Sequence, residues 1–273
     1  ERVDSESARE VVTALQLKSG VCDLECRFFG SLEIRDSSGR ELTPVWRTKT
    51  TRELFVLFAT GQRKKFSKDQ LIDAFWPSRT LRSAAHSLHV EISALRSVLK
   101  EIVQTDLDRQ KLILLESQQY CVNPKVRIKT DVQEFERLVG QAAAIAHDRS
   151  RSRVLYGQAF DLYRGDFAAG MEGQWCEEMR AHYRKIAVGI LKNLARTASE
   201  DEAHSQCRQY LKEALALDDA DESVHIAMMR CLAALKDRSG VQEQYRMMVK
   251  KLKSLGVEQP PREATQIYEE SLR

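Results

Sequence analysis

Features of several protein classes are missing from this 273-residue sequence. No apolar run approaches the roughly 18 residues that span a membrane, and no apolar core of a signal peptide follows the N-terminus. We therefore expect a cytoplasmic protein without membrane contact. Because the sequence begins at Glu1 and not at Met, we also expect it to be part of a longer protein.

Motifs of catalysis and metal binding are missing too. The sequence contains no Walker, GxGxxG, HExxH or GxSxG motif, and its six histidines are scattered over different predicted helices. Its six cysteines lie far apart, and the CxxxC pair Cys22 and Cys26 has no partners to complete a zinc site. The sequence therefore predicts reduced, mostly buried thiols, no metal, no cofactor and no enzymatic activity.

The charges that are present are unevenly distributed. Residues 26–125 carry 17 Lys and Arg against 11 Asp and Glu, a net charge of +6, whereas residues 126–273 carry 23 of each. A basic excess confined to one part of a chain is expected where that part meets a polyanion such as nucleic acid.

The stretch from Leu81 to Lys100 is the most informative segment of this basic part. Apolar residues recur at helical spacing along one face: Leu81, Ala84, Leu88, Ile92, Leu95 and Leu99. Hydrogen-bond donors follow a second face: Arg82, His86, His89, Ser93, Arg96 and Lys100. A helix buried along the first stripe can lie in a major groove and contact base edges and phosphates with the second. A surface helix with a solvated polar face is the alternative interpretation.

The segments before this helix predict a small sheet and two further helices. Short strands are expected at Cys26–Phe29, Ser31–Arg35 and Glu41–Val45. A capping box at Thr50 and Glu53 then opens a helix that runs to Gly61, and Ser67 caps a second, Lys68–Phe75, which Pro77 ends. The start of the first helix offers cations, hydroxyls and backbone N–H groups for a phosphate, from Arg47, Lys49, Thr50 and Thr51. Ordinary capping is the alternative.

A predicted hairpin follows the basic helix, with strands Leu112–Leu115 and Tyr120–Asn123 around the turn Glu116–Gln119. Three helices of which the third is basic, a leading sheet and a trailing hairpin together form a winged helix, in which the hairpin tip reaches the flanking groove or backbone. The fold class is therefore α+β in this part, with a winged helix-turn-helix and a small antiparallel sheet.

Residues 126–273 are predicted to be nearly all helical. The expected helices are Asp131–His147, Ser150–Tyr163, Gln174–Ala198, Asp201–Leu217, Asp221–Leu235, Gly240–Ser254 and Glu263–Leu272. From Asp201 on they form pairs of about 34–38 residues, which indicates tetratricopeptide-like stacking. We thus divide the chain into a tail at 1–25, a winged helix at 26–125 and an all-α domain at 126–273. The basic group Arg149, Arg151 and Arg153 is either an anion site or a solvated helix start.

Several motifs in this order resemble a known family. The run Leu71–Pro77 and the segment Ala84–Leu99 resemble the OmpR-type winged helix of Streptomyces antibiotic regulatory proteins. Thr130–Leu138, Tyr163–Phe167, Trp175–Glu178 and Leu255–Pro261 resemble the bacterial transcriptional activation domain that follows it in that family. The resemblance covers about residues 26–272.

The resemblance implies a sequence-specific transcription regulator in the bacterial cytoplasm, typically an activator that recruits RNA polymerase near promoter repeats in double-stranded DNA. Helix Arg82–Lys100 would be the recognition helix, and the turn with Ser117, Gln118 and Gln119 the wing. The loop with Pro77, Ser78, Arg79 and Thr80 would contact polymerase. Binding as a homodimer or in tandem on direct repeats, and a sensor module upstream in a longer chain, are compatible with the family.

Three positions depart from the family pattern. His86 stands where the family often has Asn, Ala94 stands where a basic residue is usual, and Glu91 lies near the expected DNA side. The Glu91 carboxylate could accept from a cytosine amino group or repel phosphate. These departures keep open an alternative function, a helical-repeat scaffold for protein interaction or small-ligand sensing with a winged helix impaired in DNA binding.

Overall fold

The computed structural model describes residues 22–61, 64–102, 112–124 and 126–273. The chain forms two compact units. The N-terminal unit comprises the described residues up to Glu134 together with Gly165–Arg180, and the helical unit comprises Phe135–Arg164 and Ala181–Arg273. The helix expected within residues 1–25 lies outside the described residues.

A four-stranded sheet forms one side of the N-terminal unit, in the order β3–β2–β1–β7. Its strands are β1 (Cys22–Arg27), β2 (Glu33–Asp36), β3 (Glu41–Leu42) and β7 (Val126–Thr130). β1 pairs antiparallel with β2 and parallel with β7, so that Leu24 lies opposite Ile128. Side chains in β7 alternate between buried and exposed, as expected for a strand with one face on a core. The expected leading strands are present with shifted bounds, and the sequence did not predict β7.

The three helices of this unit are α2 (Lys49–Thr60), α3 (Lys68–Phe75) and α4 (Leu81–Ile102). The expected capping of α3 is confirmed, because Ser67 and Gln70 form a reciprocal capping box. The expected capping box at Thr50 and Glu53 is wrong. The N-cap of α2 is Thr48, two residues earlier, whose hydroxyl accepts from the backbone N–H of Thr51 at 2.9 Å, and Glu53 is buried.

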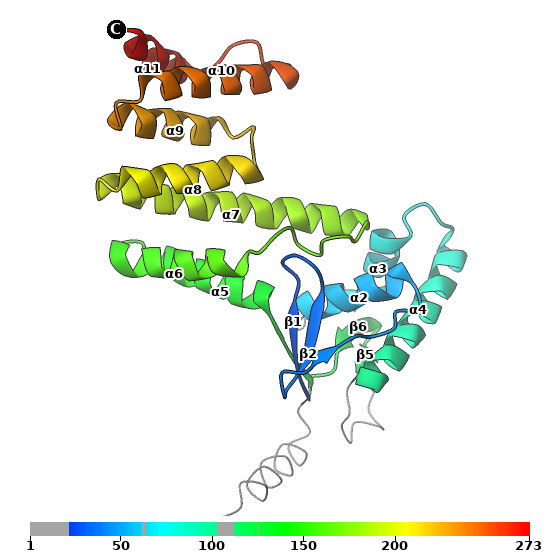
Figure 1. Ribbon diagram of the computed structural model, residues 1–273. Coiled ribbons are helices and arrows are strands. Elements are labelled where there is room, and N and C mark those ends of the chain that lie inside the picture. The colour runs from blue at the N-terminus through cyan, green and yellow to red at the C-terminus, as the bar shows by residue number, and fades with distance from the viewer. Residues whose placement is uncertain (1–21, 62–63, 103–111, 125) are drawn as a thin grey trace, which may run out of the picture. The chain divides into compact units, whose positions relative to one another are not determined.

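The predicted hairpin is confirmed. β5 (Ile113–Glu116) and β6 (Gln119–Val122) pair antiparallel, and β6 also pairs with the short strand β4 (Phe66–Ser67). Figure 1 shows the hairpin beside α4. Pairing of β6 with β4 therefore fixes the hairpin to the start of α3.

The core of the N-terminal unit includes a segment that is distant in sequence. Phe28 packs edge-on against Phe55 of α2 and against Phe167, with ring centroids 6.4 and 6.3 Å apart. The N–H of Ala168 donates to the carbonyl oxygen of Phe28 at 2.7 Å. The N–H of Gly30 donates to the carbonyl oxygen of Asp166 at 3.0 Å. The segment Gly165–Arg180 therefore completes this unit, although the sequence placed it in the all-α domain.

The helical unit is built from α5 (Asp131–Ala144) and α6 (Arg149–Leu162), then α7 (Gln174–Glu200), α8 (His204–Leu217), α9 (Glu222–Ala234), α10 (Arg238–Ser254) and α11 (Arg262–Leu272). Figure 1 shows α8 to α11 stacked in chain order. Leu211, Met229 and Met248 are fully or almost fully buried in the core between them. The predicted helices are confirmed with bounds shifted by a few residues. No helix in the described ranges has the length and apolarity to cross a membrane.

The predicted division at residue 125 falls between β6 and β7. Because β7 pairs with β1 and Gly165–Arg180 packs on Phe28, the compact N-terminal unit extends beyond that division. α5 and α7 each begin in the N-terminal unit and continue in the helical unit.

Candidate nucleic-acid interface

Helix α4 has the two faces that its sequence predicts, except that Leu81, expected in the buried stripe, is 72% exposed in the first turn. Ala84, Leu88, Ile92 and Leu95 are buried against the N-terminal unit, with at most 1% of each residue exposed. Exposed side chains on the other face are Arg82, His86, His89, Ser93 and Lys100. Burial of the apolar stripe holds the helix in place by the hydrophobic effect and leaves the polar stripe at the surface.

Glu91 joins α4 to the beginning of α2. Its carboxylate accepts a hydrogen bond of 2.7 Å from the Thr48 hydroxyl and another from the Thr51 hydroxyl. The Glu91 carboxylate therefore binds hydroxyl groups of α2 and its N-cap. The sequence had suggested only that it accepts from a base or repels phosphate. Thr51 is 0% exposed. Because a fully buried side chain cannot reach DNA, we withdraw the expectation that Thr51 contacts it and assign Thr51 to the joint between the helices.

Arg96 joins α4 to the hairpin. Its Nε and Nη2 atoms both donate to the carbonyl oxygen of Ile113 in β5, at 2.9 and 2.8 Å. Burial lowers the pKa of the guanidinium, but arginine stays protonated at any physiological pH. Two of its three nitrogens are thus used to position β5 beside α4. The structure makes Arg96 a positioning residue for the wing, which the helical spacing alone did not indicate.

The beginning of α2 carries the remaining candidates for phosphate contact. Arg47 and Lys49 are exposed, and Thr50 is half-buried. The Lys49 ammonium donates to the Glu172 carboxylate at 2.9 Å, a hydrogen bond that lowers the pKa of Glu172. Both side chains are about three-quarters exposed, at 74% and 78%. Such an exposed pair contributes little free energy, so Lys49 can exchange Glu172 for a phosphate at little cost.

The loop before α4 is exposed from Pro77 to Thr80. The buried indole of Trp76 anchors its first end. At the other end Arg79 donates to the Ser87 hydroxyl on α4 at 2.9 Å. The loop is therefore held to α4 at its base, while its surface is exposed.

The hairpin tip is exposed and its backbone is unusual. Ser117 and Gln118 have φ angles of 47° and 66°, the left-handed values that a two-residue type I′ turn requires. Residues other than Gly, Asn and Asp adopt this backbone conformation at an energetic cost. Lys65 holds the adjacent Glu116 by an ion pair of 3.0 Å.

Replacing Gln118 by glycine is expected to raise the free energy of unfolding by about 0.5–1 kcal/mol, because glycine adopts positive φ without steric cost. Thermal unfolding of the two chains measures the effect. As a control, Gln209→Gly, at an exposed position inside α8, is expected to lower stability by about 1 kcal/mol, because glycine disfavours a helix interior. A lower melting temperature for Gln118→Gly would contradict the assignment of this turn.

Two residues that position the interface were not identified from the sequence. The Asp131 carboxylate accepts from the backbone N–H groups of Phe28 and Phe29 at the end of β1. The Arg180 guanidinium donates to the carbonyls of Phe167, Ala168 and Met171. The partners of Asp131 lie more than 100 residues earlier in the sequence, so no local pattern indicates them. Those of Arg180 lie 9 to 13 residues before it, in a segment without regular periodicity.

The positions of the other singled-out side chains are also clear. Arg149 and Arg153 pair with Glu200 and Asp201, and Arg151 pairs with Asp148. The five cysteines with described side chains are buried and unpaired by disulfides: Cys26, Cys121, Cys176, Cys207 and Cys231. Among the described residues no cluster of His, Cys, Asp and Glu is arranged to hold a metal ion.

Three helices with a hairpin wing, followed in the chain by stacked helix pairs, define a winged-helix fold with a tetratricopeptide-like array. The chain belongs to the bacterial transcriptional activator domain family, whose model matches residues 130–273. This agrees with the resemblance to Streptomyces antibiotic regulatory proteins and identifies a family of transcription regulators.

The solved structure of EmbR from Mycobacterium tuberculosis, in complex with a low-affinity phosphopeptide, has the same fold. The two chains align with a TM-score of 0.72 and 17% identity over 92% of this chain. The aligned part is 65% of the EmbR chain, slightly less than two thirds. A tetratricopeptide-containing domain of a putative FK506-binding protein from Plasmodium falciparum aligns with 52% of this chain and 88% of its own, at a TM-score of 0.40 and 12% identity. No curated protein matches the sequence.

Proposed function

We propose that this chain is a sequence-specific DNA-binding transcription activator that works in the bacterial cytoplasm. The observation that carries the proposal is the exposed polar face of α4, held on a buried apolar face in a chain of an activator family. Arg82, His86, His89 and Ser93 present donors that suit base edges in a major groove. Their spacing on one helix lets them read neighbouring base pairs.

Contacts on either side of α4 would set the register of the protein on the duplex. The beginning of α2 supplies Arg47, Lys49 and Thr50, and the wing supplies Ser117, Gln118 and Gln119. Phosphate contacts of this kind position a protein without reading sequence. Glu91 and Arg96 connect these two elements to α4. A duplex that fits α4 would therefore meet all three elements together.

The exposed loop Pro77–Thr80 is the proposed contact for RNA polymerase, and the helical unit is proposed to hold further protein partners. Because the loop is anchored to α4 through Arg79 and Ser87, binding of α4 to DNA would fix its position. Two chains on direct repeats would then present two such loops to the polymerase.

The test is selection of duplexes from a random library by the whole chain, followed by sequencing of the retained fragments. We expect enrichment of one short motif, and of repeats of it where two chains bind together. Transcription in vitro from a promoter that carries the motif should then rise on addition of the chain. If no fragment is retained even at low salt, where phosphate contacts are strongest, DNA binding is excluded and the scaffold alternative replaces it.

A further inference from the structure

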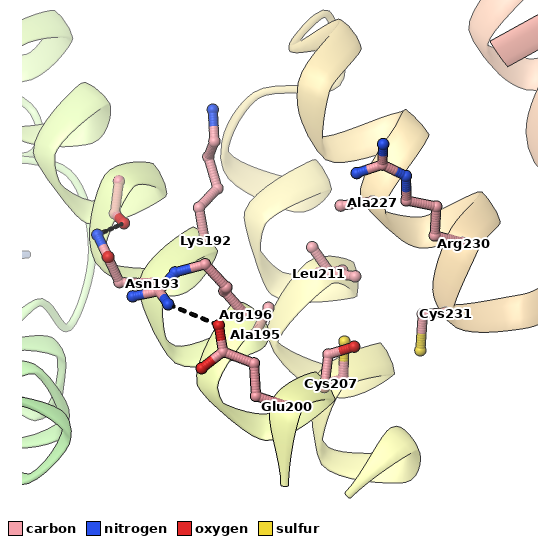
Figure 2. A pocket seen from close by; sticks show the side chains of 12 residues that line it. Lys192, Asn193, Ala195, Arg196, Glu200, Cys207, Leu211, Ala227, Arg230 and Cys231 are labelled. Atoms are coloured by element: carbon pink, nitrogen blue, oxygen red, sulfur yellow. Dashed lines mark hydrogen bonds and ion pairs between the residues drawn. The ribbon is translucent and has the colours of Figure 1, made fainter. Parts of the chain in front are cut away.

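The helical unit contains a pocket of about 550 Å³ between α7, α8 and α9. Figure 2 shows the side chains that line it. Its volume lies within the range of about 300–1,000 Å³ that is typical of sites for small molecules. The pocket lies wholly within the helical unit and contains none of the residues proposed to bind DNA.

The floor of the pocket is apolar. Ala195, Leu211, Cys207 and Cys231 line it and are each at most 3% exposed. Burial raises the pKa of Cys207 to about 12, so this sulfur is a neutral thiol at physiological pH. The Cys231 thiol donates to the carbonyl of His204 at 3.3 Å. Buried thiols of this kind act as small apolar groups, and the floor therefore favours the uncharged part of a ligand.

The rim is basic. Arg196 and Arg230 enter from the α7 and α9 sides, and their side chains are 56% and 66% exposed. Arg196 pairs with Glu200 at 2.8 Å, and Arg230 with Glu263, which does not line the pocket, at 2.5 Å. Exposed ion pairs contribute about 0–1 kcal/mol, so both guanidinium groups can turn to an anion at little cost.

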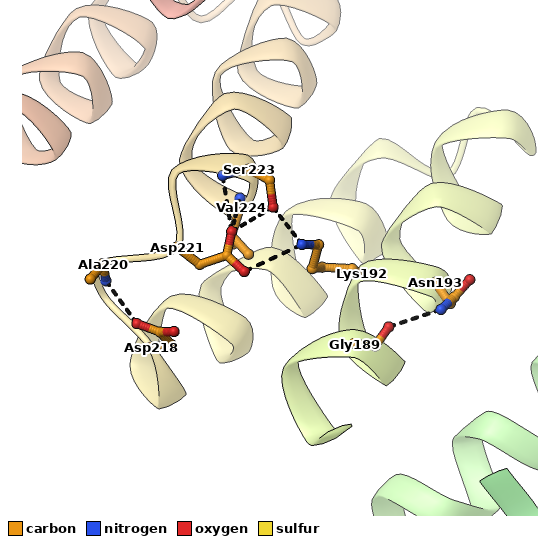
Figure 3. Close-up of polar contacts among 8 residues, drawn as sticks. All are labelled: Gly189, Lys192, Asn193, Asp218, Ala220, Asp221, Ser223 and Val224. Carbon is orange, nitrogen blue, oxygen red and sulfur yellow. Dashed lines mark hydrogen bonds and ion pairs between the residues drawn. The ribbon is translucent and has the colours of Figure 1, made fainter. Parts of the chain in front are cut away.

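Lys192 has a different role at the same rim. Its ammonium contacts the Asp221 carboxylate at 3.3 Å and the Ser223 hydroxyl, as Figure 3 shows. Asp221 is also the N-cap of α9, because it accepts from the N–H groups of Ser223 and Val224. Lys192 thereby ties α7 to the beginning of α9 and fixes the spacing of the two walls.

Gly189 supplies room at the edge of the pocket. It lies within α7, where glycine costs about 1 kcal/mol relative to alanine. A Cβ atom placed on it would meet no heavy atom within 4 Å, so packing within the helical unit does not require a glycine there. The unfilled space beside it belongs to the pocket.

From these observations we propose that the pocket binds a small amphiphilic anion. Its carboxylate or phosphate group would bind Arg196 and Arg230, and its aliphatic or aromatic body would lie over Leu211, Cys207 and Cys231. The proposal adds a ligand to the helical unit and does not depend on DNA binding. Its failure would leave the proposed function untouched.

The test uses the whole chain and the fluorescent probe 8-anilinonaphthalene-1-sulfonate, which combines an anionic group with an aromatic body. We expect saturable binding at one site. Decanoate and decyl phosphate are then tested as competitors, and the more effective of the two identifies the anionic group. Decanol, which has the same body without a charge, should compete at least tenfold less well. Equal competition by decanol would overturn the assignment of an anion.

Two pairs of variants locate the site. Gly189→Phe should fill the pocket and weaken probe binding at least tenfold, whereas Gly157→Phe, at an equally unobstructed glycine in α6, should leave it unchanged. Arg230→Met should weaken binding about tenfold, whereas Arg246→Met should not. Arg246 is a matched control, because it is 64% exposed and pairs with Glu243 on its own helix.

Thermal unfolding of each variant shows whether the fold is kept. If Gly189→Phe unfolds, the Arg230 and Arg246 pair still decides the question. Equal loss in Gly189→Phe and Gly157→Phe, or no loss in Arg230→Met, would overturn the proposed site.

Discussion

Asp131→Ala is expected to lower the free energy of unfolding of the N-terminal unit by about 2–4 kcal/mol, because the N–H groups of two buried residues lose a carboxylate acceptor. The carboxylate accepts from the N–H of Phe28 at 2.8 and 3.0 Å and from that of Phe29 at 2.9 Å. Both phenylalanines are buried. Burial raises the pKa of Asp131, and the backbone N–H groups that bind it act in the opposite direction.

Tryptophan fluorescence during urea unfolding measures this effect. The three tryptophans, Trp46, Trp76 and Trp175, all lie in the N-terminal unit, so the signal reports that unit and not the helical unit. Asp131→Asn keeps one acceptor oxygen and should cost less, about 1 kcal/mol.

Asp36→Ala is the matched control for that measurement. Asp36 also accepts backbone N–H groups, from Ser38 and Arg40, but in an exposed turn. Water replaces an exposed acceptor, so this change should cost less than about 1 kcal/mol. An Asp131→Ala chain as stable as the Asp36→Ala chain would refute the proposed role of Asp131 as the joint between β1 and α5.

Elements that depend on local periodicity could be predicted from the sequence. The apolar spacing of α4 and of the helices after Asp131 places side chains on one face whatever the rest of the chain does. The β-rich runs on either side of Ser117 and Gln118 likewise predicted the hairpin. The family motifs placed these elements in the right order.

Elements that depend on distant partners could not be predicted. β7 is a short run that pairs parallel to a strand about 100 residues earlier, and its neighbour Asp131 binds Phe28 across 103 positions. Phe167 packs on the same Phe28 from a segment that the sequence assigned to another domain. A local pattern carries no information on such a partner. The compact N-terminal unit extends past residue 125, where the sequence predicted a division.

The candidate interface shows the same limit at the level of side chains. The helical spacing of α4 correctly places Arg82 and Arg96 on its polar side, but it does not show what each guanidinium binds. Arg96 is held by the Ile113 carbonyl, 17 residues further on, whereas Arg82 lies exposed in the first turn of α4. The N-cap of α2 shows the same limit, because the hydroxyl of the observed cap, Thr48, also donates to Glu91, 43 residues away.

Arg82→Ala is expected to weaken binding to the selected DNA motif by about 1–3 kcal/mol, or roughly 5- to 150-fold, as for loss of a bidentate contact to guanine. Binding to unrelated duplexes should fall much less, because it depends on phosphate contacts. Fluorescence anisotropy of labelled duplexes at one fixed salt concentration measures both affinities. The ratio of the affinity for the motif to the affinity for unrelated duplexes distinguishes a base contact from a phosphate contact, which neither affinity does alone.

Arg40→Ala provides the matched control, because it removes an equal charge from the turn before β3, where Arg40 is 63% exposed and pairs with Asp36. It should leave the ratio unchanged. Arg96→Ala should lower affinity for both kinds of duplex, because it releases β5 and with it the wing, rather than one base contact. If Arg82→Ala lowers both affinities equally, Arg82 contacts phosphate and the bases are read by other residues of α4. An unchanged ratio together with unchanged affinities would remove the first turn of α4 from the interface.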